Sequence, residues 1–417
     1  MHKLIINGGK KLNGEINISG AKNSAVALIP GAILCDEKIT LSNVPNISDV
    51  SALEEILIYL NAKIEKNGNE LIILSDKIEN KKIDEKLAKK LRASYYFMGA
   101  LLGKYKHVEM CFPGGCTIGS RPIDLHLKGF EKLGATVKED GDNFIIDAKE
   151  LKGTKIYLDF ASVGATINLM YAAVKASGTT IIENAAKEPE IVNVATYLNN
   201  MGAKITGAGT NKIKIYGVKK LHSCFHEVIP DRIEAGTYEI IAAAVGEKIR
   251  INNIIPEHLE VLNEKLLEMG VNLKISDDFV EITSSKELKS CEIKTEIFPG
   301  FPTDLQQVIA SLMTIAKGDS LIHETIWENR FLNLYELQKM GAKIKIDGDK
   351  AIIKGPSKLK GTEVIASDLR AGAGLIVAAL ISKGETTIKN ADYILRGYEN
   401  IVKKLNNIGA DIKLIEE

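Results

Sequence analysis

The chain has 417 residues, 45% of them apolar, and a formal net charge of zero. This length is sufficient for two or three domains with separate hydrophobic cores. The zero charge gives no global attraction to nucleic acid or membrane, and no apolar run approaches the roughly 20 residues that cross a bilayer. The first residues lead into strand-like sequence rather than a signal peptide, so we expect a cytoplasmic globular protein.

A helix-ending segment followed by a hairpin recurs about every 70 residues along the chain. Five of the six copies carry glycine where a helix C-cap requires a left-handed residue, and an asparagine fills that position in the first copy. The six residues are Asn61, Gly134, Gly202, Gly270, Gly341 and Gly409. Each follows an amphipathic stretch, which predicts a helix on the surface.

A second helix in each copy is apolar or small on all sides, which predicts complete burial. These stretches are 24–34, 93–102, 165–176, 235–245, 305–316 and 371–381. With the strand-like pieces between them, each copy reads strand, helix, strand, helix, strand, strand. Three buried helices wrapped by sheets and outer helices make one domain, so the pattern predicts an α/β protein with six βαβαββ repeats, three in each of two domains.

The last repeat has room for only one strand after Gly409, at 411–415. The strand-like residues 2–8 at the other end of the chain are the expected partner. We therefore predict one domain formed by 1–20 together with 230–417, and a second formed by 21–229. A cleft between two domains is a common place for a substrate site.

Arginines mark the turns that begin helices. Only seven of the 54 basic residues are arginine, and six of these lie at expected strand-to-helix turns, whereas Arg250 lies in a strand. The six are Arg92, Arg121, Arg232, Arg330, Arg370 and Arg396. Helix amino termini with planar guanidinium groups favour a polyanionic ligand. The alternative is that arginines simply favour exposed turns.

A glycine-rich segment at 111–122 has prolines near both ends, which is typical of a loop that moves as a flap. Cys116 lies near its middle and Arg121 follows five residues later. A thiol there can act as a general acid, or as a nucleophile when cations favour the thiolate. The alternative is a small apolar residue without a chemical role, which is the expectation for Cys111.

Carboxylates at helix starts have an ordinary explanation. Asp231, Asp304 and Asp368 each lie where a buried helix begins, and the residues alone favour N-capping for all three. The five cysteines contain no CxxC pair and the seven histidines no HExxH motif, so neither a disulfide framework nor a zinc site is expected.

The chain resembles the UDP-N-acetylglucosamine 1-carboxyvinyltransferases, a family of enolpyruvyl transferases, along essentially its whole length. Motifs that carry the resemblance are Lys22-Asn23, the Cys116 flap, Arg121-Pro122-Ile123-Asp124-Leu125, Ser162-Val163-Gly164, the segment 183–190, Pro230-Asp231-Arg232, Thr303-Asp304, Glu328-Asn329-Arg330, Asp368-Leu369-Arg370 and Arg396-Gly397-Tyr398. One departure is Phe160, where some relatives have a basic residue near the diphosphate.

The resemblance implies the inside-out α/β barrel fold and an addition–elimination reaction between phosphoenolpyruvate and UDP-N-acetylglucosamine, the first committed step of peptidoglycan synthesis, without a metal or organic cofactor. It implies that phosphoenolpyruvate is held by Lys22, Arg121, Arg370 and Arg396. Cys116 would protonate C3 and Asp304 would accept the hydroxyl proton. The nucleotide sugar would contact Asn23, Arg92, Arg121, Pro122, Ile123, Asp124, Leu125, Ser162, Val163, Gly164 and Ile326, with Arg330 and Asp368 in support.

Three other functions are compatible with parts of the pattern. The sister enzyme that transfers enolpyruvyl to shikimate 3-phosphate shares the fold but lacks the cysteine flap. A non-catalytic nucleotide-sugar-binding paralogue could keep the binding residues, although intact Lys22, Cys116, Asp304 and Arg396 speak against it. A nucleic-acid clamp is disfavoured because the net charge is zero and the arginines are confined to turns.

Overall fold

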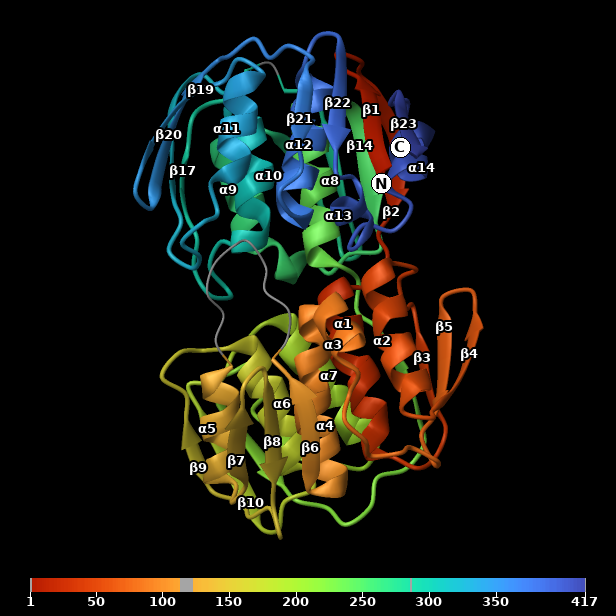
Figure 1. Ribbon diagram of the computed structural model, residues 1–417. Coiled ribbons are helices and arrows are strands. Elements are labelled where there is room, and N and C mark those ends of the chain that lie inside the picture. Colours follow the sequence, from red (N-terminus) through yellow and green to blue (C-terminus); the bar gives the residue numbers. More distant parts are fainter. Residues whose placement is uncertain (1, 113–122, 286, 417) are drawn as a thin grey trace. The chain divides into compact units, whose positions relative to one another are not determined.

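The computed structural model describes residues 2–112, 123–285 and 287–416 (Figure 1). These residues divide into two compact units. Of the described residues, those up to Ser19 and from Pro230 onward form the discontinuous unit, and those from Gly20 to Ile229 form the continuous unit. Each unit has its own cluster of buried apolar side chains.

The continuous unit begins with a helix and ends with a strand. Its helices are α1 (Lys22–Gly31), η1 (Ala32–Leu34), α2 (Ser48–Tyr59), α3 (Glu85–Lys90), η2 (Arg92–Tyr95), α4 (Tyr96–Tyr105), α5 (Asp124–Lys132), α6 (Val163–Ala173) and α7 (Pro189–Asn200). Its strands are β3 (Ile39–Ser42), β4 (Lys63–Asn67), β5 (Glu70–Leu74), β6 (His107–Cys111), β7 (Thr136–Asp140), β8 (Asn143–Asp147), β9 (Lys155–Tyr157), β10 (Thr179–Glu183), β11 (Lys204–Thr206), β12 (Lys212–Tyr216) and β13 (Cys224–Glu227).

The discontinuous unit repeats the same pattern with the chain's two ends joined in one sheet. Its strands are β1 (His2–Asn7), β2 (Leu12–Asn17), β14 (Gly246–Asn252), β15 (Asn272–Ile275), β16 (Phe279–Thr283), β17 (Glu292–Lys294), β18 (Gly318–His323), β19 (Lys343–Asp347), β20 (Lys350–Gly355), β21 (Glu363–Ile365), β22 (Glu385–Lys389) and β23 (Ile412–Glu416). Its helices are α8 (Arg232–Val245), η3 (Pro256–His258), α9 (Glu260–Glu268), α10 (Thr303–Met313), α11 (Leu332–Lys339), α12 (Leu369–Ile381), α13 (Asp392–Leu395) and α14 (Ile401–Asn407).

Three sheets are found in the described residues of each unit. In the continuous unit the strand orders are β13-β3-β5-β4, β6-β8-β7 and β11-β12-β10-β9. In the discontinuous unit they are β15-β16-β14-β2, β17-β18-β20-β19 and β21-β22-β1-β23. The three buried helices of each unit, α1, α4 and α6 or α8, α10 and α12, pack against one another inside these sheets. This is the six-repeat α/β arrangement that the sequence predicts.

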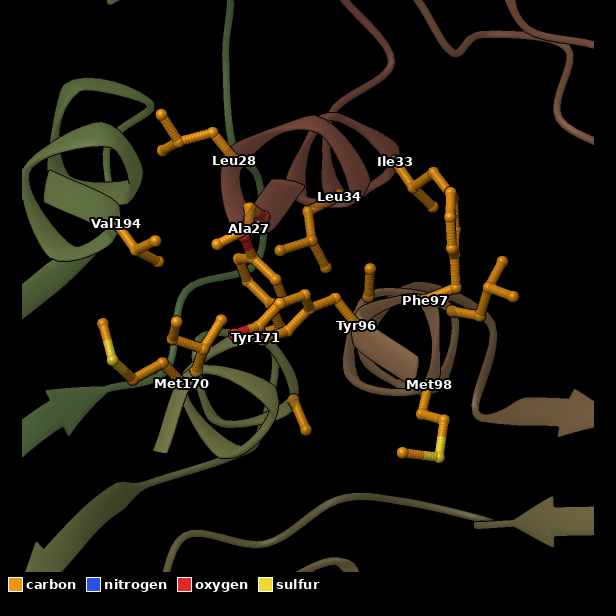
Figure 2. Close-up of a cluster of buried hydrophobic side chains, with 14 of the residues drawn as sticks. Ala27, Leu28, Ile33, Leu34, Tyr96, Phe97, Met98, Met170, Tyr171 and Val194 are labelled. Atoms are coloured by element: carbon orange, nitrogen blue, oxygen red, sulfur yellow. Dashed lines mark hydrogen bonds between the residues drawn. The ribbon is translucent and has the colours of Figure 1, made fainter. Parts of the chain in front are cut away.

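Small residues let the buried helices of the continuous unit approach closely. Tyr171 of α6 points toward α1, where its hydroxyl donates to the carbonyl oxygen of Ala27 (Figure 2). A Cβ atom at Gly31 would lie 2.9 Å from the Tyr171 ring, so only glycine fits there. The amide of Gly99 in α4 donates to Asn168 Oδ1 of α6 at 2.7 Å. These contacts explain why the sequence of these helices is small and apolar on every side.

The six residues expected at helix C-caps lie one position beyond the C-cap residue, and all six have left-handed backbone conformation. Asn61 has a φ of 71°, and the five glycines have φ values between 85° and 104°. In the first five repeats a hairpin begins two residues later, as at Asn61 before β4, and after Gly409 the single strand β23 follows. Because L-residues other than asparagine seldom adopt this conformation, the repeat is visible in the sequence as a repeated glycine.

A second recurring device joins the ends of neighbouring parallel strands in three of the repeats. In the first, third and fourth repeats, an asparagine with positive φ directly follows the second strand. Its side-chain amide donates to the carbonyl oxygen of the residue that follows the neighbouring parallel strand, at 2.7–2.9 Å. The pairs are Asn43 with Val228, Asn184 with Leu158, and Asn253 with Ile18. Asn390 of the sixth repeat has the same backbone conformation.

The second repeat departs from the expected pattern. The segment before its buried helix forms the short helix α3 instead of a strand, and its sheet has three described strands. Asp84 caps α3 by accepting hydrogen bonds from the amides of Lys86 and Leu87 at 2.9 and 3.2 Å. An ion pair of 2.5 Å joins Glu85 and Lys89 one turn apart. Capping and the i, i+4 pair therefore favour a helix in this segment.

Candidate active site

Asp304 is held by two arginines at the start of α10. Its Oδ1 accepts a hydrogen bond from Arg330 Nη2 at 2.9 Å, and its Oδ2 accepts one from Arg370 Nη2 at 3.3 Å. The side chains of Arg330 and Arg370 are only 1% and 5% exposed, whereas that of Asp304 is 30% exposed. Asp304 and Arg330 belong to the fifth repeat and Arg370 to the sixth, and the fold of the discontinuous unit brings them together.

These contacts test the ordinary explanations given above, which are N-capping for Asp304 and a preference for exposed turns for the arginines. The N-cap position of α10 belongs to Pro302, so the capping role that the residues alone favour for Asp304 is wrong. Its carboxylate instead takes the stronger charge-assisted bonds that two guanidinium groups offer. Arg330 and Arg370 are buried, so the view that these turn arginines merely favour exposure is also wrong for them.

The two buried guanidinium groups still have unused donors. Arg370 Nη1 and Arg330 Nε are buried and have no hydrogen-bond partner in the described part of the chain. Arg370 also faces the ring of Tyr398, 5.4 Å from its centroid, and the Tyr398 hydroxyl lies 2.8 Å from Thr237 Oγ1. A buried charged donor without a partner is costly, so it indicates a place for an anionic ligand.

N-capping is confirmed for the other two aspartates. Asp231 accepts hydrogen bonds from the first-turn amides of α8 at 2.8 and 3.0 Å. Asp368 accepts bonds from the first-turn amides of α12 at 2.9 and 3.0 Å, and its other oxygen accepts one from Gln307 Nε2 at 3.2 Å. Asp368 therefore fixes the backbone of Arg370, and this is the support that it gives to the cluster.

Arg396 does not lie where the sequence predicts. It is the C-cap residue of α13, between two short helices, rather than in a turn that leads from a strand to a helix. Its side chain is half-buried. Arg250 lies in β14 as expected, 3.6 Å from the ring centroid of Phe279, so it packs as an ordinary strand residue.

Lys22 begins the first buried helix of the continuous unit. Its Nζ lies 3.0 Å from Asp49 Oδ2, and the two side chains are 16% and 4% exposed. Asp49 belongs to the outer helix α2. Asn23 follows Lys22 in the first turn of α1 and is half-buried. The ammonium group is thus positioned by a buried carboxylate at a helix amino terminus.

A second polar group in the continuous unit surrounds the start of α6. His126 Nδ1 lies 3.0 Å from Asn168 Nδ2, and the Tyr95 ring lies edge-on to the imidazole at 5.1 Å. Burial, together with the positive charge of Arg92, lowers the pKa of His126 to about 3. A Cβ atom at Gly164 would lie 2.8 Å from the Tyr95 hydroxyl, so these side chains pack directly against the helix start.

Ser162 caps α6 by accepting a hydrogen bond from the amide of Ala165 at 3.2 Å, with Val163 and Gly164 in the first turn. Phe160 precedes it and is 50% exposed, so this turn offers no cation at that position. Ile123 is buried at the N-cap of α5, while Asp124 is exposed and Leu125 half-buried. Cys116, Arg121 and Pro122 lie outside the described residues.

Glu324 is a buried residue that sequence reasoning missed. It follows β18, is 3% exposed, and accepts hydrogen bonds from the backbone amides of Ile326 and Trp327 at 2.9 and 3.2 Å. It also accepts a hydrogen bond from Thr303, the first residue of α10. In four other repeats an asparagine follows the corresponding strand, and this recurrence is the sequence signal that points to the position of Glu324.

Neither a cluster of metal-ligating side chains nor a membrane-spanning helix is found in the described part of the chain. Among residues 2–112, 123–285 and 287–416, no three His, Cys, Asp or Glu side chains are grouped so that they could bind a metal ion. Nor does any helix within these ranges have the length and hydropathy needed to cross a membrane.

Comparison with known proteins gives one consistent result. Residues 6–405 match the family described as EPSP synthase (3-phosphoshikimate 1-carboxyvinyltransferase). The chain is 52% identical to UDP-N-acetylglucosamine 1-carboxyvinyltransferase 2 of Listeria monocytogenes over 98% of its length and 97% of the relative's. It is also 52% identical to UDP-N-acetylglucosamine 1-carboxyvinyltransferase of Streptococcus pneumoniae, with both chains covered completely.

Two solved structures have the same arrangement of elements. The enolpyruvyl transferase NikO from Streptomyces tendae superposes with a TM-score of 0.90 at 26% identity, and 99% of each chain is covered. EPSP synthase from Acinetobacter baumannii superposes with a TM-score of 0.77 at 18% identity, and both chains are covered completely. The second likeness concerns the fold alone.

Proposed function

This chain belongs to the UDP-N-acetylglucosamine 1-carboxyvinyltransferases, a family of enolpyruvyl transferases, and from that premise we propose that it transfers enolpyruvyl from phosphoenolpyruvate to UDP-N-acetylglucosamine. The acceptor is the sugar 3-hydroxyl and the second product is phosphate, as in the first committed step of peptidoglycan synthesis. The observation that carries the proposal is the Asp304 cluster, where a carboxylate and unused guanidinium donors meet at a helix start. The expected cytoplasmic location stays a prediction.

The relatives also rank the alternatives. Proteins that are 52% identical over nearly the whole length carry the nucleotide-sugar name, whereas the solved EPSP synthase is only 18% identical. Transfer to shikimate 3-phosphate is therefore not favoured. A non-catalytic binding protein has no need for a carboxylate and a cysteine in acid–base positions, so we do not favour it either.

The donor phosphoenolpyruvate carries a phosphate and a carboxylate, and cations must hold both. We assign this role to Lys22, Arg121, Arg370 and Arg396. Arg370 is well suited because its Nη1 is buried and has no partner in the described residues. A preorganised guanidinium costs little reorganisation, and it stabilises charge as the phosphate leaves.

Two proton transfers accompany the addition. The sugar 3-hydroxyl oxygen bonds to C2 of phosphoenolpyruvate, Asp304 accepts the hydroxyl proton, and Cys116 gives a proton to C3. In the elimination the C2–O bond to phosphate breaks and C3 loses a proton, which restores the double bond. Each positioned acid or base contributes about 10²- to 10⁴-fold to such a step.

Arg370 can serve both the donor and Asp304. Its Nη2 lies 3.3 Å from Asp304 Oδ2, while its buried Nη1 has no partner in the described residues. A donor anion that binds Nη1 leaves the contact to Asp304 in place, so one guanidinium group can hold the donor beside the base.

The nucleotide sugar is the polyanionic ligand that the helix starts favour. We assign its binding to Asn23, Arg92, Ser162, Val163, Gly164, Ile326 and the segment Arg121, Pro122, Ile123, Asp124 and Leu125. The capped amino terminus of α6 supplies backbone N–H groups beside Ser162. Arg330 and Asp368 act through Asp304 and Arg370.

The proposal is tested by phosphate release from phosphoenolpyruvate, measured with UDP-N-acetylglucosamine and separately with shikimate 3-phosphate. We expect release only with the nucleotide sugar. Release with shikimate 3-phosphate would support the sister activity. Binding of the nucleotide sugar without release under any condition would support the non-catalytic protein instead.

The cysteine has its own test. We expect Cys116→Ser to lose most turnover while the unfolding transition stays unchanged, because a hydroxyl is a far weaker acid than a thiol. Rates are compared from neutral to alkaline pH, with alkylated wild type as a second inactive form. The buried Cys35 provides a matched control, since Cys35→Ser should keep turnover. Wild-type rates in Cys116→Ser would remove its acid role.

A further inference from the structure

Glu324 occupies the position at which four other repeats carry a left-handed asparagine. The parallel pairing of β17 with β18 ends at Lys294 and His323, which makes Thr295 and Glu324 the next opposed residues. The backbone amide of Thr295 donates to His323 at 3.0 Å, the same bond that Val228, Leu158 and Ile18 make in their repeats. Glu324 is thus the equivalent of Asn43, Asn184 and Asn253, without their positive φ.

At this position the Glu324 carboxylate accepts a hydrogen bond, whereas the equivalent asparagines donate one. In the first, third and fourth repeats the asparagine amide donates to a backbone carbonyl, whereas Glu324 Oε1 accepts a bond from the Thr295 hydroxyl at 2.9 Å. The carbonyl oxygen of Thr295 is satisfied by the Thr325 hydroxyl. The ends of β17 and β18 are therefore joined by a side chain, as the equivalent strands are in the first, third and fourth repeats. The Glu324 carboxylate can still accept further hydrogen bonds.

These further hydrogen bonds connect Glu324 to two segments of the candidate site, the Ile326 turn and the start of α10. Oε1 also accepts bonds from the amides of Ile326 and Trp327 at 2.9 and 3.2 Å, and Oε2 accepts one from Thr303 Oγ1 at 2.8 Å. An asparagine amide has a single acceptor oxygen and a shorter side chain, so it could not make this set of contacts. Four satisfied hydrogen bonds around a buried carboxylate form a rigid unit.

We propose that Glu324 is a positioning residue for enolpyruvyl transfer, which holds the Ile326 turn and the start of α10 with Asp304 in one fixed arrangement. The inference rests on the proposed function, because it uses the roles of Ile326 in nucleotide-sugar binding and of Asp304 as proton acceptor. The Oε1 bonds set the Ile326 backbone, and the Oε2 bond sets Thr303, the residue before Asp304.

Four variants of the full chain separate the two connections. Glu324→Ala removes both, and Thr303→Val removes only the bond to α10. Glu324→Gln is the conservative variant, because its amide oxygen can face Thr295 and both amides while its NH₂ group donates to the Thr303 hydroxyl. Asn253→Gly removes the equivalent strand-end tie in the fourth repeat and keeps the left-handed backbone.

Equilibrium binding of UDP-N-acetylglucosamine by calorimetry and phosphate release are measured on each variant, with thermal unfolding alongside. For Glu324→Ala we expect the Kd to rise and kcat to fall, each about 10-fold or more, since small misplacements of this kind cost up to about 10²-fold. Thr303→Val should lower kcat with little change in Kd. Glu324→Gln should recover both values, and Asn253→Gly should lower only the unfolding temperature.

Three results would overturn the proposal: unchanged Kd and kcat in Glu324→Ala, an equal loss of binding in Asn253→Gly, or a wild type that does not bind the nucleotide sugar. A wild type that binds the nucleotide sugar but releases no phosphate would defeat the proposed function alone. In that case the Kd for the nucleotide sugar still tests whether Glu324 positions the Ile326 turn, because it should rise in Glu324→Ala and not in Asn253→Gly.

Discussion

Single residues at the start of α10 show how a polar cluster can be assembled from distant segments. Asp304, Arg330 and Arg370 come from two repeats of the chain and meet within 2.9–3.3 Å. Two buried positive charges are tolerated because a carboxylate and an aromatic ring face them. The same arrangement leaves guanidinium donors for a ligand.

The first prediction at this scale concerns the carboxylate itself. Asp304→Asn keeps the shape but removes the negative charge, so we expect turnover to fall about 10²-fold or more. The loss of charge beside two buried guanidinium groups should also lower the free energy of unfolding by roughly 1–3 kcal/mol. Steady-state kinetics and urea unfolding measure the two effects. Asp319→Asn, which breaks an exposed 3.8 Å ion pair, should change neither.

A second prediction concerns Glu239 in α8, whose two carboxylate oxygens are buried and have no hydrogen-bond partner among the described residues. Burial raises its pKa from 4.5 to about 8. Between these values the folded state binds more protons than the unfolded state, so this residue's stabilising contribution is complete below pH 4.5 and is lost as the pH rises to 8. At most it amounts to about 1.4 kcal/mol per pH unit.

Glutamine does not titrate, so the stability of Glu239→Gln should fall less than that of wild type between pH 5 and pH 8 by this order of magnitude. Urea unfolding of both proteins at several pH values gives the difference directly. Parallel pH profiles for the two proteins would contradict the prediction.

At the scale of elements, two backbone devices repeat and only one is visible as a fixed residue pattern. The C-cap position requires a left-handed residue, and glycine or asparagine fills all six copies. The strand-end position accepts several solutions, because asparagine ties the carbonyl of the opposed residue in some repeats and Glu324 ties its hydroxyl in the fifth. Sequence reasoning found the first device and missed the second for this reason.

Gly409 allows the cost of the left-handed backbone conformation to be measured without steric crowding. A Cβ atom at Gly409, whose φ is 99°, would meet no atom within 4 Å. Gly409→Ala should therefore destabilise the protein by about 1 kcal/mol through backbone strain alone, and Gly409→Asn by less. Urea unfolding of the three proteins measures the order. Equal stability of the alanine and asparagine variants would show that the strain is relieved by local rearrangement.

At the scale of the whole molecule, the two ends of the chain complete one sheet. Strand β1 pairs antiparallel with β22 on one side and with β23 on the other. Leu4 and Ile6 point into the core of the discontinuous unit and are fully buried. We propose that the two units are separate domains, divided near residues 20 and 230.

Removal of residues 2–7 should prevent stable folding of the discontinuous unit, since it leaves the edges of both neighbouring strands unpaired and opens the core. The continuous unit keeps all its strands in this variant, so a protease-resistant fragment from within 20–229 should survive. Limited proteolysis with mass analysis is the measurement. Leu4→Ala is the milder variant and should cost about 2–5 kcal/mol. Equal protease resistance of both units after the deletion would contradict the proposal.

The sequence by itself determined the repeats, the six buried helices, the use of the amino-terminal strand and the family, because backbone conformation and burial restrict residue type locally. Only the tertiary structure decided that Asp304 binds arginines and is not a cap, that Arg330 and Arg370 are buried, and that Glu324 joins two segments. It also shows α3 in place of the first strand of the second repeat, where local capping by Asp84 favours the helix. The arginine cluster and the Glu324 contacts instead join residues far apart in the chain, and such contacts leave no periodic signal in the residues themselves.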